Sequence, residues 1–280
     1  FFGLRFVFCR IIKREIKSME KKLLILGIRG VPARHGGFET FAEHLSLYLV
    51  DRGWEVTVYC QGDDVQSGVV RDVWRGVNRI TIPVEGDGAA ATVPFDWKTV
   101  MYEFRQPKRL CLTLGYNTAA FLLGLRFGGV KNLINMDGIE WKRDKWKFYE
   151  RIWLWANERC GCWFGNHLVA DHPEIAKHLA TRVNPRKITM IPYGANPVES
   201  ASTENVTRYG IEPGKYAIVI ARPEPENSVL DIVKAFSRKS RGCSLVVLGK
   251  YDGEKNAFHA EVLKSASKEV LFLVQFMRKI

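Results

Sequence analysis

The sequence lacks several features that mark common classes of protein. It has no run of 18 or more apolar residues, so we do not expect a membrane-spanning helix. Six cysteines are scattered through 280 residues without a recognisable signal peptide, which is typical of reduced thiols in a cytosolic protein. Cys160 and Cys162 form a C-x-C with no second pair and no nearby histidine cluster, so a metal site there is the weaker alternative. Internal repeats, low-complexity tracts and a G-x-S-x-G nucleophile motif are also missing.

The composition is basic, and its share of hydrophobic residues is that of an ordinary globular protein. Its 42 basic and 30 acidic residues give a net charge of +12, which favours an anionic partner such as nucleic acid, a membrane surface or a phosphorylated small molecule. Hydrophobic residues make up 46% and charged residues 26% of the chain, as in globular proteins with a sizeable core. At this length two domains are expected.

Residues 1–20 form a leader of uncertain status. The stretch "FFGLRFVFCRIIKREIKSMEKK" has no initiator methionine, and its basic residues follow the apolar ones instead of preceding them as in a signal peptide. Met19 is the natural start in our preferred interpretation. A basic amphipathic helix at a membrane surface is the alternative.

Apolar, β-prone runs alternate with helical patterns through the rest of the chain, which predicts a parallel sheet covered on both faces. We expect strands at Leu23–Leu26, Glu55–Cys60, Ile80–Pro83, Arg109–Leu114, Lys131–Met136, His167–Ala170 and Ile188–Ile191. We expect helices at Phe38–Val50, Thr118–Phe127, Lys145–Glu158 and Pro173–Thr181. Ligands of such sheets bind at the carboxyl ends of the strands.

A linker without regular structure is predicted near residues 192–213, where proline, glycine, serine and asparagine dominate. It divides an N-terminal domain, residues 21–200, from a C-terminal domain, residues 208–280. The second strand-helix series comprises Tyr216–Ala221, Val229–Phe236, Ser244–Leu248, Lys255–Ser267 and Val270–Val274. Three strands are few for a domain, so we expect this second domain to be incomplete.

The stretch "GIRGVPARHGGFETFAEH" joins the first predicted strand to a helix, which is where backbone N–H groups and the helix dipole hold phosphates. Its glycines have neither Rossmann nor P-loop spacing. Gly36 and Gly37 would let a diphosphate approach the backbone, with Arg29, Arg34 and His35 adding positive charge. The alternative is a surface turn in which glycine supplies a positive φ.

The stretch "NMDGIEWKRDKWKFYERIWLWANERC" places Asp137 at the end of a buried strand and follows it with basic and aromatic residues. Such a mixture could stack on single-stranded nucleic acid or sit at a lipid surface. The alternative is an ordinary helix whose Phe148, Ile152, Trp153 and Trp155 face the core. We expect His44 and His178 to lie on helix surfaces.

A third stretch, "IVIARPEPENSVLDIVKAF", places Arg222 between a strand and a helix. A guanidinium there is suited to grip a diphosphate, although a lone exposed loop charge is the plainer interpretation.

Five motifs in this order, "LLILGIRGVPARHGGFETFAEHLSLYLVDRGWEVTVYC", "NMDGIEWKRDKW", "LVAD", "IPYGA" and "ARPEPEN", resemble bacterial glycosyltransferases of family four. The chain is most similar to the rhamnosyltransferase-like subgroup of surface-polysaccharide assembly, over roughly residues 20–275. The resemblance implies an α/β fold of the GT-B type, with two Rossmann-like doubly wound parallel-sheet domains that face each other across a cleft. It also implies a retaining transfer without a metal or other cofactor.

The resemblance also implies roles for individual residues. Asp137 and Arg222 would be catalytic, because Asp137 occupies the strand end where many relatives have a histidine and Arg222 would stabilise the leaving diphosphate. The donor would be bound by Gly36, Gly37, Arg222, Glu226 and Asn227. The acceptor would be bound by Arg29, Arg34, His35, Glu39, Glu140, Lys142 and Arg143.

Two departures from the family pattern stand out. Many relatives have a lysine where this chain has Asn227, and the family's later glycine- and serine-rich loop and glutamate-bearing helix have no counterpart before Ile280.

The expected function is therefore an enzyme that moves a sugar, rhamnose being one option, from a nucleoside-diphosphate sugar to a lipid-linked glycan. We expect it in the cytoplasm, in peripheral contact with the anionic inner face of the plasma membrane. A non-catalytic, membrane-associated binding remnant of such an enzyme is the main alternative. We do not expect a nucleic-acid partner, because the charge is dispersed.

Overall fold

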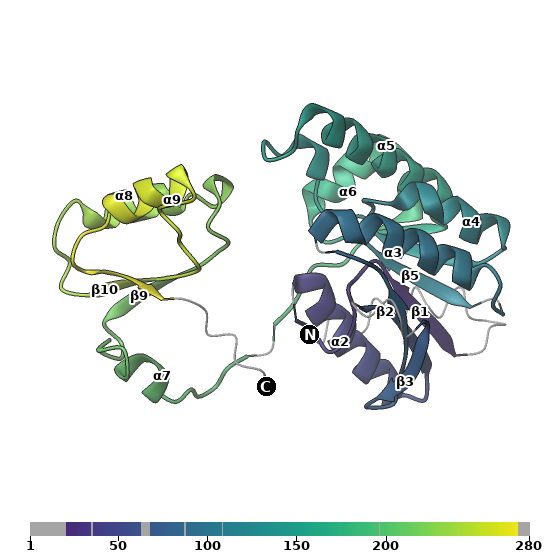
Figure 1. Cartoon of the computed structure of the whole chain (residues 1–280), viewed down its shortest axis with the longest axis horizontal. Coiled ribbons are helices and arrows are strands. Elements are labelled where there is room, and N and C mark those ends of the chain that lie inside the picture. The colour runs from purple at the N-terminus through teal and green to yellow at the C-terminus, as the bar shows by residue number, and fades with distance from the viewer. Residues whose placement is uncertain are drawn as a thin grey trace. The chain divides into compact units, whose positions relative to one another are not determined.

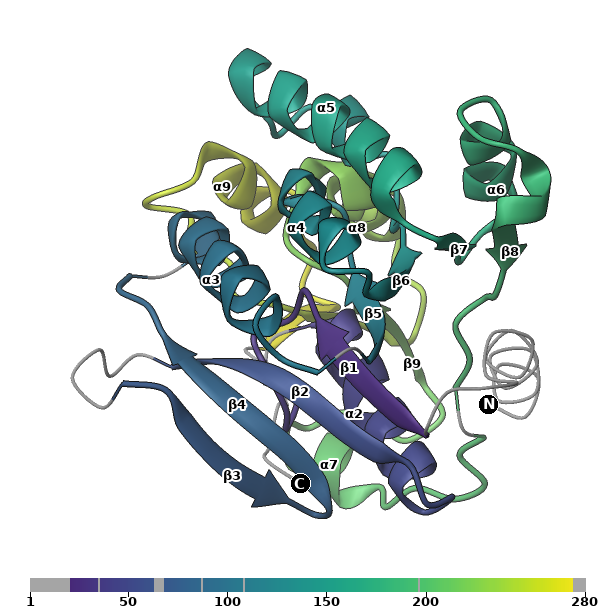
Figure 2. The same ribbon diagram turned by 90° about the vertical axis from the view of Figure 1, so that its right-hand side faces the viewer.

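The computed structural model describes residues 21–273 except 35, 63–67, 87, 108 and 196. The chain divides into two compact units, Phe1–Asn196 and Pro197–Ile280, which we call the N-terminal and C-terminal units. Each is an open α/β sheet with helices packed on it (Figures 1 and 2). The division falls a few residues before the predicted domain end at residue 200.

The N-terminal unit has an eight-stranded sheet in the order β3-β4-β2-β1-β5-β6-β7-β8. All neighbouring pairs are parallel except β3 and β4. Its strands are β1 Lys22–Leu26, β2 Glu55–Gly62, β3 Val70–Trp74, β4 Val77–Pro83, β5 Leu110–Leu114, β6 Lys131–Asn135, β7 His167–Ala170 and β8 Ile188–Met190. The order reverses at β1, so the carboxyl ends of β1 and β5 flank the topological switch point, the usual ligand site of such sheets.

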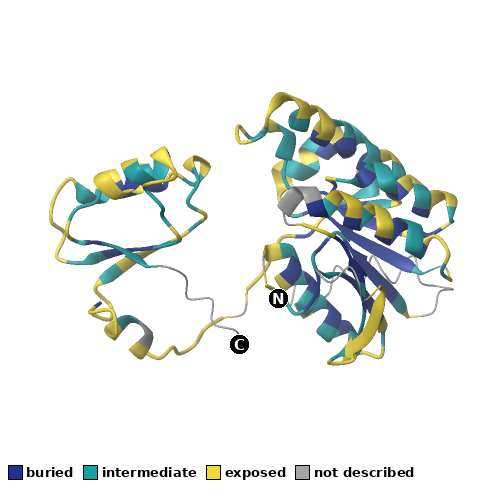
Figure 3. Ribbon diagram, in the orientation of Figure 1, coloured by how far each residue is buried: buried dark blue, intermediate teal, exposed yellow. Residues whose placement is uncertain are grey.

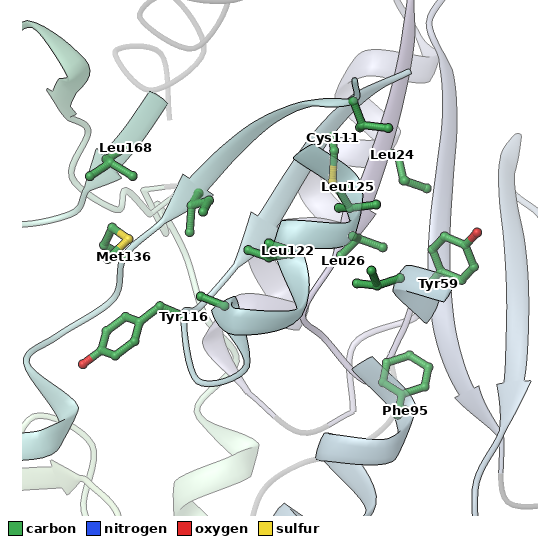
Figure 4. Packing of buried hydrophobic residues seen from close by; sticks show 14 of the residues in the cluster. Leu24, Leu26, Tyr59, Phe95, Cys111, Tyr116, Leu122, Leu125, Met136 and Leu168 are labelled. Carbon is green, nitrogen blue, oxygen red and sulfur yellow. The ribbon is translucent and has the colours of Figure 1, made fainter. Parts of the chain in front are cut away.

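Helices cover both faces of this sheet because successive side chains of a strand point to opposite sides. Leu23 and Ile25 of β1 share one apolar cluster with helix α2, Gly37–Val50. Leu24 and Leu26 belong to the opposite cluster, shown in Figure 4. That second cluster is covered by α3 Gly88–Glu103, α4 Leu122–Phe127, α5 Phe148–Phe164 and α6 Pro173–Ala180. The central strands are consequently the most deeply buried part of the unit (Figure 3).

The predicted strands and helices of this unit are present, and the structure adds two elements. Strand β3 forms a hairpin with β4 through Arg75 and Gly76, whose φ values of 48° and 81° are those of a tight two-residue turn. Helix α3 contains Pro94, which the sequence pattern does not favour inside a helix. Both elements lie in a stretch for which only one strand was predicted.

Helix α5 corrects one alternative from the sequence. Phe148, Ile152, Trp153 and Trp155 do not face the core, since their exposed fractions range from 41% to 79%. The buried residues of this helix are Leu154, Asn157, Glu158, Gly161 and Cys162. The helix also begins at Phe148 instead of Lys145.

The C-terminal unit has a three-stranded parallel sheet in the order β11-β10-β9. Its strands are β9 Tyr216–Ile220, β10 Ser244–Leu248 and β11 Val270–Leu273, and its helices are α7 Glu204–Thr207, α8 Val229–Ser237 and α9 Ala257–Lys264. Helices α8 and α9 share one apolar cluster with Leu245 and Val247 of β10, whereas Ile218 and Ile220 of β9 are exposed. Helix α7 lies within the predicted linker, so that segment is not wholly irregular.

None of the helices that the structure describes is long and apolar enough to cross a bilayer.

Candidate functional site

The switch point of the N-terminal sheet brings two loops very close together. Gly27 follows β1 with φ 82°, and a Cβ atom at this position would lie 2.3 Å from the carbonyl oxygen of Leu114 at the end of β5. Gly115, the next residue after β5, has φ 89°. Only glycine fits at Gly27, so the sequence enforces a tight approach of the two strand ends.

The glycine pair before α2 has a different role. Gly36 has an extended φ of −166° and Gly37 is the first helical residue, so the interpretation of a turn that needs a positive φ is wrong. A Cβ atom at either glycine would meet nothing within 4 Å. The first N–H groups of a helix have no intrahelical acceptor, and the N-cap Gly36 has no side chain to accept from them. Among the described residues no side chain caps this helix, so its first N–H groups are available to a phosphate.

The loop that leads to α2 is held by two carboxylates of the helix. Glu39 Oε2 accepts from the N–H of Arg34 at 3.1 Å, and Glu43 Oε2 accepts from the N–H of Ala33 at 2.6 Å. Glu39 is buried, so one of its evident roles is to fix the loop.

Three of the predicted acceptor-side residues, Arg29, Arg34 and Glu39, line a single open cavity of about 400 Å3. Arg79 also lines it, but Asp72 holds that guanidinium through two hydrogen bonds of 2.6 and 2.7 Å. The guanidinium groups of Arg29 and Arg34 have no ion-pair partner within the described part of the chain. His35, the remaining basic residue of this loop, lies outside the described residues.

Asp137 follows β6 in a left-handed conformation, with φ 49°, which is uncommon for a residue other than glycine. Its N–H donates to Asn135 Oδ1 at 3.1 Å, and Asn135 Nδ2 donates to Tyr193 Oη at 3.2 Å. Burial raises the pKa of Asp137, and the neighbouring carboxylates of Glu140 and Asp171 raise it further. A constrained, desolvated carboxylate of this kind is typical of functional sites.

Asp137 lines a cavity of about 160 Å3 beneath the switch point, together with Gly27, Gly115 and Phe38. A second carboxylate, Asp96 of α3, lines the same cavity, and Thr118 Oγ1 donates to Asp96 Oδ2 at 2.6 Å. Burial raises the pKa of Asp96 to about 6. The sequence reasoning missed Asp96 because it missed α3.

The remaining predicted acceptor residues lie elsewhere. Glu140 pairs with Arg143 at 2.9 Å and with Lys145 at 3.9 Å, and Lys142 lies over the ring of Trp141, 5.4 Å from its centroid. Glu140, Lys142 and Arg143 line neither the 160 Å3 nor the 400 Å3 cavity. The structure therefore groups them with the aromatic side chains near α5 and not with Arg29 and Arg34.

His178 is not a plain surface residue. Its Nε2 atom lies 3.0 Å from Oε2 of the buried Glu158, which also accepts from Trp141 Nε1 at 2.7 Å and pairs with Arg159 at 3.2 Å. This cluster ties α6 to α5 and to the segment after Asp137.

In the C-terminal unit, Arg222 follows β9, and its side chain is 63% exposed, 4.0 Å from Glu224 Oε1. Asn227 Nδ2 donates to the backbone oxygen of Arg222 at 2.9 Å and thereby closes the turn before α8. Glu226 lies in the same turn and is exposed. The structure thus brings the three predicted donor residues of this unit together in one turn, with the guanidinium in solvent.

Comparison with known proteins places the N-terminal unit in a family. The DUF1972 profile, described as a domain of unknown function, matches residues 20–196, well over half of the chain. The chain belongs to the DUF1972 family. The match covers the bare helix N-terminus, both cavities and Asp137, whereas Arg222, Glu226 and Asn227 lie outside it.

Several solved structures are similar to this DUF1972 protein. Sucrose-phosphate synthase from Thermosynechococcus elongatus matches with a TM-score of 0.71 at 15% identity, over 91% of this chain and 70% of that chain. A UDP-forming trehalose-phosphate synthase from Burkholderia xenovorans matches with a TM-score of 0.63 at 10% identity, over 93% and 74%. HepE from Anabaena in complex with UDP-glucose matches with a TM-score of 0.64 at 12% identity, over 90% and 68%.

These similarities confirm the predicted fold class, because the DUF1972 protein shares its α/β architecture with GT-B glycosyltransferases over both units. At these identities the likeness concerns the fold alone. A search of curated protein sequences found no match.

Proposed function

We propose that the chain is a retaining glycosyltransferase that moves a sugar from a nucleoside-diphosphate sugar to a lipid-linked glycan of surface-polysaccharide assembly. One observation carries this assignment. The uncapped N-terminus of α2 and the half-buried carboxylate of Asp137 belong to the same carboxyl edge of the sheet, where proteins of this fold bind ligands. Rhamnosyl transfer is the form of the reaction that the sequence motifs favour.

The proposed donor site rests on charge. Breaking the bond between a sugar and a diphosphate leaves negative charge on the departing oxygen, and a catalyst must stabilise that charge. The N–H groups after Gly36 can supply part of this stabilisation, and the exposed guanidinium of Arg222 can supply a charge-assisted hydrogen bond. That HepE has been solved with UDP and with UDP-glucose supports a nucleotide-sugar as the donor class.

Asp137 is proposed to act at the sugar. An ionised carboxylate accepts hydrogen bonds from sugar hydroxyls, and with a raised pKa it is better suited to receive a proton from an acceptor hydroxyl. The hydrogen bond from its N–H to Asn135 fixes the backbone and thereby the direction of the carboxylate.

The cavity of Arg29 and Arg34 is proposed to bind an anionic part of the acceptor. Arginine is suited to phosphate because its planar guanidinium donates two parallel hydrogen bonds, and both side chains are without an ion-pair partner among the described residues. A lipid-linked glycan carries phosphate next to its first sugar. Glu39 serves here by holding the loop that carries Arg34.

We propose a metal-independent reaction. This proposal rests on the resemblance of the sequence motifs to glycosyltransferases of family four. In this scheme the helix N-terminus and Arg222 do the work that a divalent cation does in metal-dependent transferases.

Peripheral contact with an anionic membrane would bring the enzyme to a lipid-linked acceptor. The surface formed by Trp141, Trp146, Phe148, Ile152 and Trp155, which we call the α5 aromatic patch, is an open apolar groove. Basic side chains surround it, with Lys145 4.5 Å from the ring centroid of Trp146 and Arg159 3.8 Å from that of Trp155. Aromatic residues ringed by basic ones are suited to an anionic lipid surface. We therefore propose a position at the inner face of the plasma membrane.

A non-catalytic, membrane-associated binding remnant is the second candidate. It is favoured by Asn227, which stands where many family-four enzymes have a lysine and whose amide is engaged with the backbone of Arg222. One positive charge of the expected diphosphate grip is thereby absent.

The two candidates differ in what they do with a donor. Protein from the whole open reading frame would be incubated with UDP-, GDP- and dTDP-sugars, dTDP-rhamnose included, and with lipid-linked acceptors, and transfer would be followed by chromatography of the labelled lipid. An enzyme transfers at least one sugar, with retention of configuration. A remnant binds anionic vesicles but neither binds nor hydrolyses any donor.

A further inference from the structure

The 160 Å3 cavity combines apolar side chains, among them Phe38, Phe121 and Leu122, with seven polar side chains that can hydrogen-bond to hydroxyls. Two carboxylates, an amide and four threonines contribute to it, along with the backbone of two glycines. The side chains are Asp96, Asp137, Asn117, Thr92, Thr99, Thr113 and Thr118. Its volume is about half of the smallest typical pocket for a drug-sized ligand, so it suits one ring and not an extended chain.

Thr99 gives this cavity a feature that the fold does not explain. The residue is 2% exposed, and its hydroxyl has no hydrogen-bond partner among the described residues. Two other hydroxyls of the cavity are already engaged, since Thr113 Oγ1 donates to Asn132 and Thr118 Oγ1 donates to Asp96. Buried hydroxyls are seldom left without a partner, so Thr99 is suited to meet a group that enters the cavity.

The carboxylate of Asp96 lowers the stability of the folded protein when it is ionised. It is held on α3 by the 2.6 Å bond from Thr118, and no cation pairs with it among the described residues. Burial raises the pKa of this carboxyl, which means that the ionised form destabilises the folded protein. Proteins retain such groups chiefly at functional sites.

We propose that Asp96 and Thr99, together with Asp137, form a subsite for a single uncharged, hydroxyl-bearing sugar ring of the acceptor. This inference rests on the proposed function and specifies its substrate class. The two carboxylates accept from ring hydroxyls and the threonine hydroxyl completes the set. The same carboxylates repel uronic acids and sugar phosphates, because a further negative charge would meet two carboxylates, and no Lys or Arg is among the described residues that line the cavity. The phosphate of the acceptor then belongs at Arg29 and Arg34, in the other cavity.

The test measures binding and needs no catalysis. Methyl α-rhamnoside and methyl α-glucoside would be titrated against the 280-residue protein by saturation-transfer NMR, with glucose 6-phosphate as the charged probe. Asp96→Asn and Thr99→Val should each weaken binding of the neutral glycosides about tenfold, because each leaves a buried ring hydroxyl without its partner. Ser46→Ala is the matched control, since Ser46 is a buried helical hydroxyl without a partner among the described residues and does not line the cavity.

Thermal unfolding separates binding from a purely structural role. Asparagine preserves the shape of Asp96 and the hydrogen bond from Thr118. Because the pKa of Asp96 is raised, stability contributed by the wild-type residue is lost as the pH rises from about 4 to about 6, and the variant escapes that loss. Asp137, the other carboxyl of the cavity, is unchanged in this comparison. We expect Asp96→Asn to be at least as stable as the wild type at pH 8, yet defective in binding.

The outcomes are distinct. Equal binding of neutral glycosides by wild type, Asp96→Asn and Thr99→Val, no binding by the wild type, or equal binding of glucose 6-phosphate would overturn the subsite. Glycoside binding that depends on Asp96, without transfer from any nucleotide-sugar, would support the subsite and contradict the proposed enzyme. Sugar transfer that is insensitive to Asp96→Asn would support the proposed enzyme and contradict the subsite.

Discussion

The backbone N–H of Asp137 donates a hydrogen bond to the Oδ1 atom of Asn135, 3.1 Å away. Asn135 is the last residue of β6, so this bond links Asp137 to the strand that precedes it. This bond accompanies the left-handed φ of Asp137, and it places a half-buried carboxylate just after the carboxyl end of β6. The Nδ2 atom of Asn135 donates to Tyr193 Oη, and the ring of Tyr193 makes edge-on contacts with Phe38 and Phe41 of α2. The proposed sugar-binding carboxylate and the proposed phosphate-binding helix are thus joined through two side chains.

Asp137→Asn should lower the rate of sugar transfer by about 10²–10⁴ if the carboxylate takes a proton from the acceptor. Stability should not fall, because burial raises the pKa of Asp137 and the amide removes a desolvated charge. Transfer kinetics and thermal unfolding at pH 8 check both parts. Asp144→Asn is the control, since Asp144 is an exposed aspartate of the same segment. Equal turnover by the two variants would remove Asp137 from the reaction.

Gly37→Val should weaken donor binding without unfolding the protein. A Cβ atom at Gly37 meets nothing within 4 Å, so the fold tolerates it, but the side chain would cover the N–H groups to which a diphosphate must come close. Gly27→Ala provides the contrast, because its Cβ would lie 2.3 Å from the oxygen of Leu114. Calorimetric titration with UDP-sugars and thermal melts should show a binding defect in the first and a stability defect in the second. Unchanged donor affinity in Gly37→Val would show that the helix N-terminus does not bind the phosphates.

Arg222→Ala should reduce transfer by about 10²–10³, the usual loss for one group that stabilises developing negative charge. Its 4.0 Å contact with Glu224 is exposed and contributes little to stability, so the melting temperature should not change. Arg238→Ala, at an exposed position after α8, is the matched control. Wild-type turnover in Arg222→Ala would contradict the proposed role.

Phe148→Ser combined with Trp155→Ser should reduce binding to vesicles that contain anionic phospholipid, because both side chains belong to the α5 aromatic patch. Phe127→Ser is a close control, since Phe127 and Phe148 are both 79% exposed and Phe127 lies outside the patch. Sedimentation with vesicles measures the difference. The same loss of binding in the control would assign the effect to general surface hydrophobicity.

The fold followed from the sequence where apolar runs were long and regular. The central strands β1 and β5 are almost wholly buried, so nearly every residue in them is apolar and the signal is strong. Strand β3 escaped prediction because it lies at an exposed edge of the sheet and its residues are mixed in character. Helix α3 escaped because Pro94 and a glycine-rich start are typical of loops.

The site was predicted only in part, for related reasons. The ends of buried strands can be predicted from a sequence, and the segments that follow such ends contain Gly36, Gly37 and Asp137. Asp96 was missed together with its helix. The aromatic residues of α5 were assigned to the core as one alternative because aromatic side chains usually are buried, and only the fold shows that the opposite side of this helix packs inward.

The most direct test of the central claim is a transfer assay with wild-type protein from the whole open reading frame, nucleoside-diphosphate sugars and a lipid-linked acceptor, with and without a metal chelator. We predict transfer of one sugar with retained anomeric configuration, undiminished by the chelator and slowed about 10²–10⁴-fold in Asp137→Asn. Failure to bind, hydrolyse or transfer any donor, by a protein that still folds and still binds anionic vesicles, would contradict it.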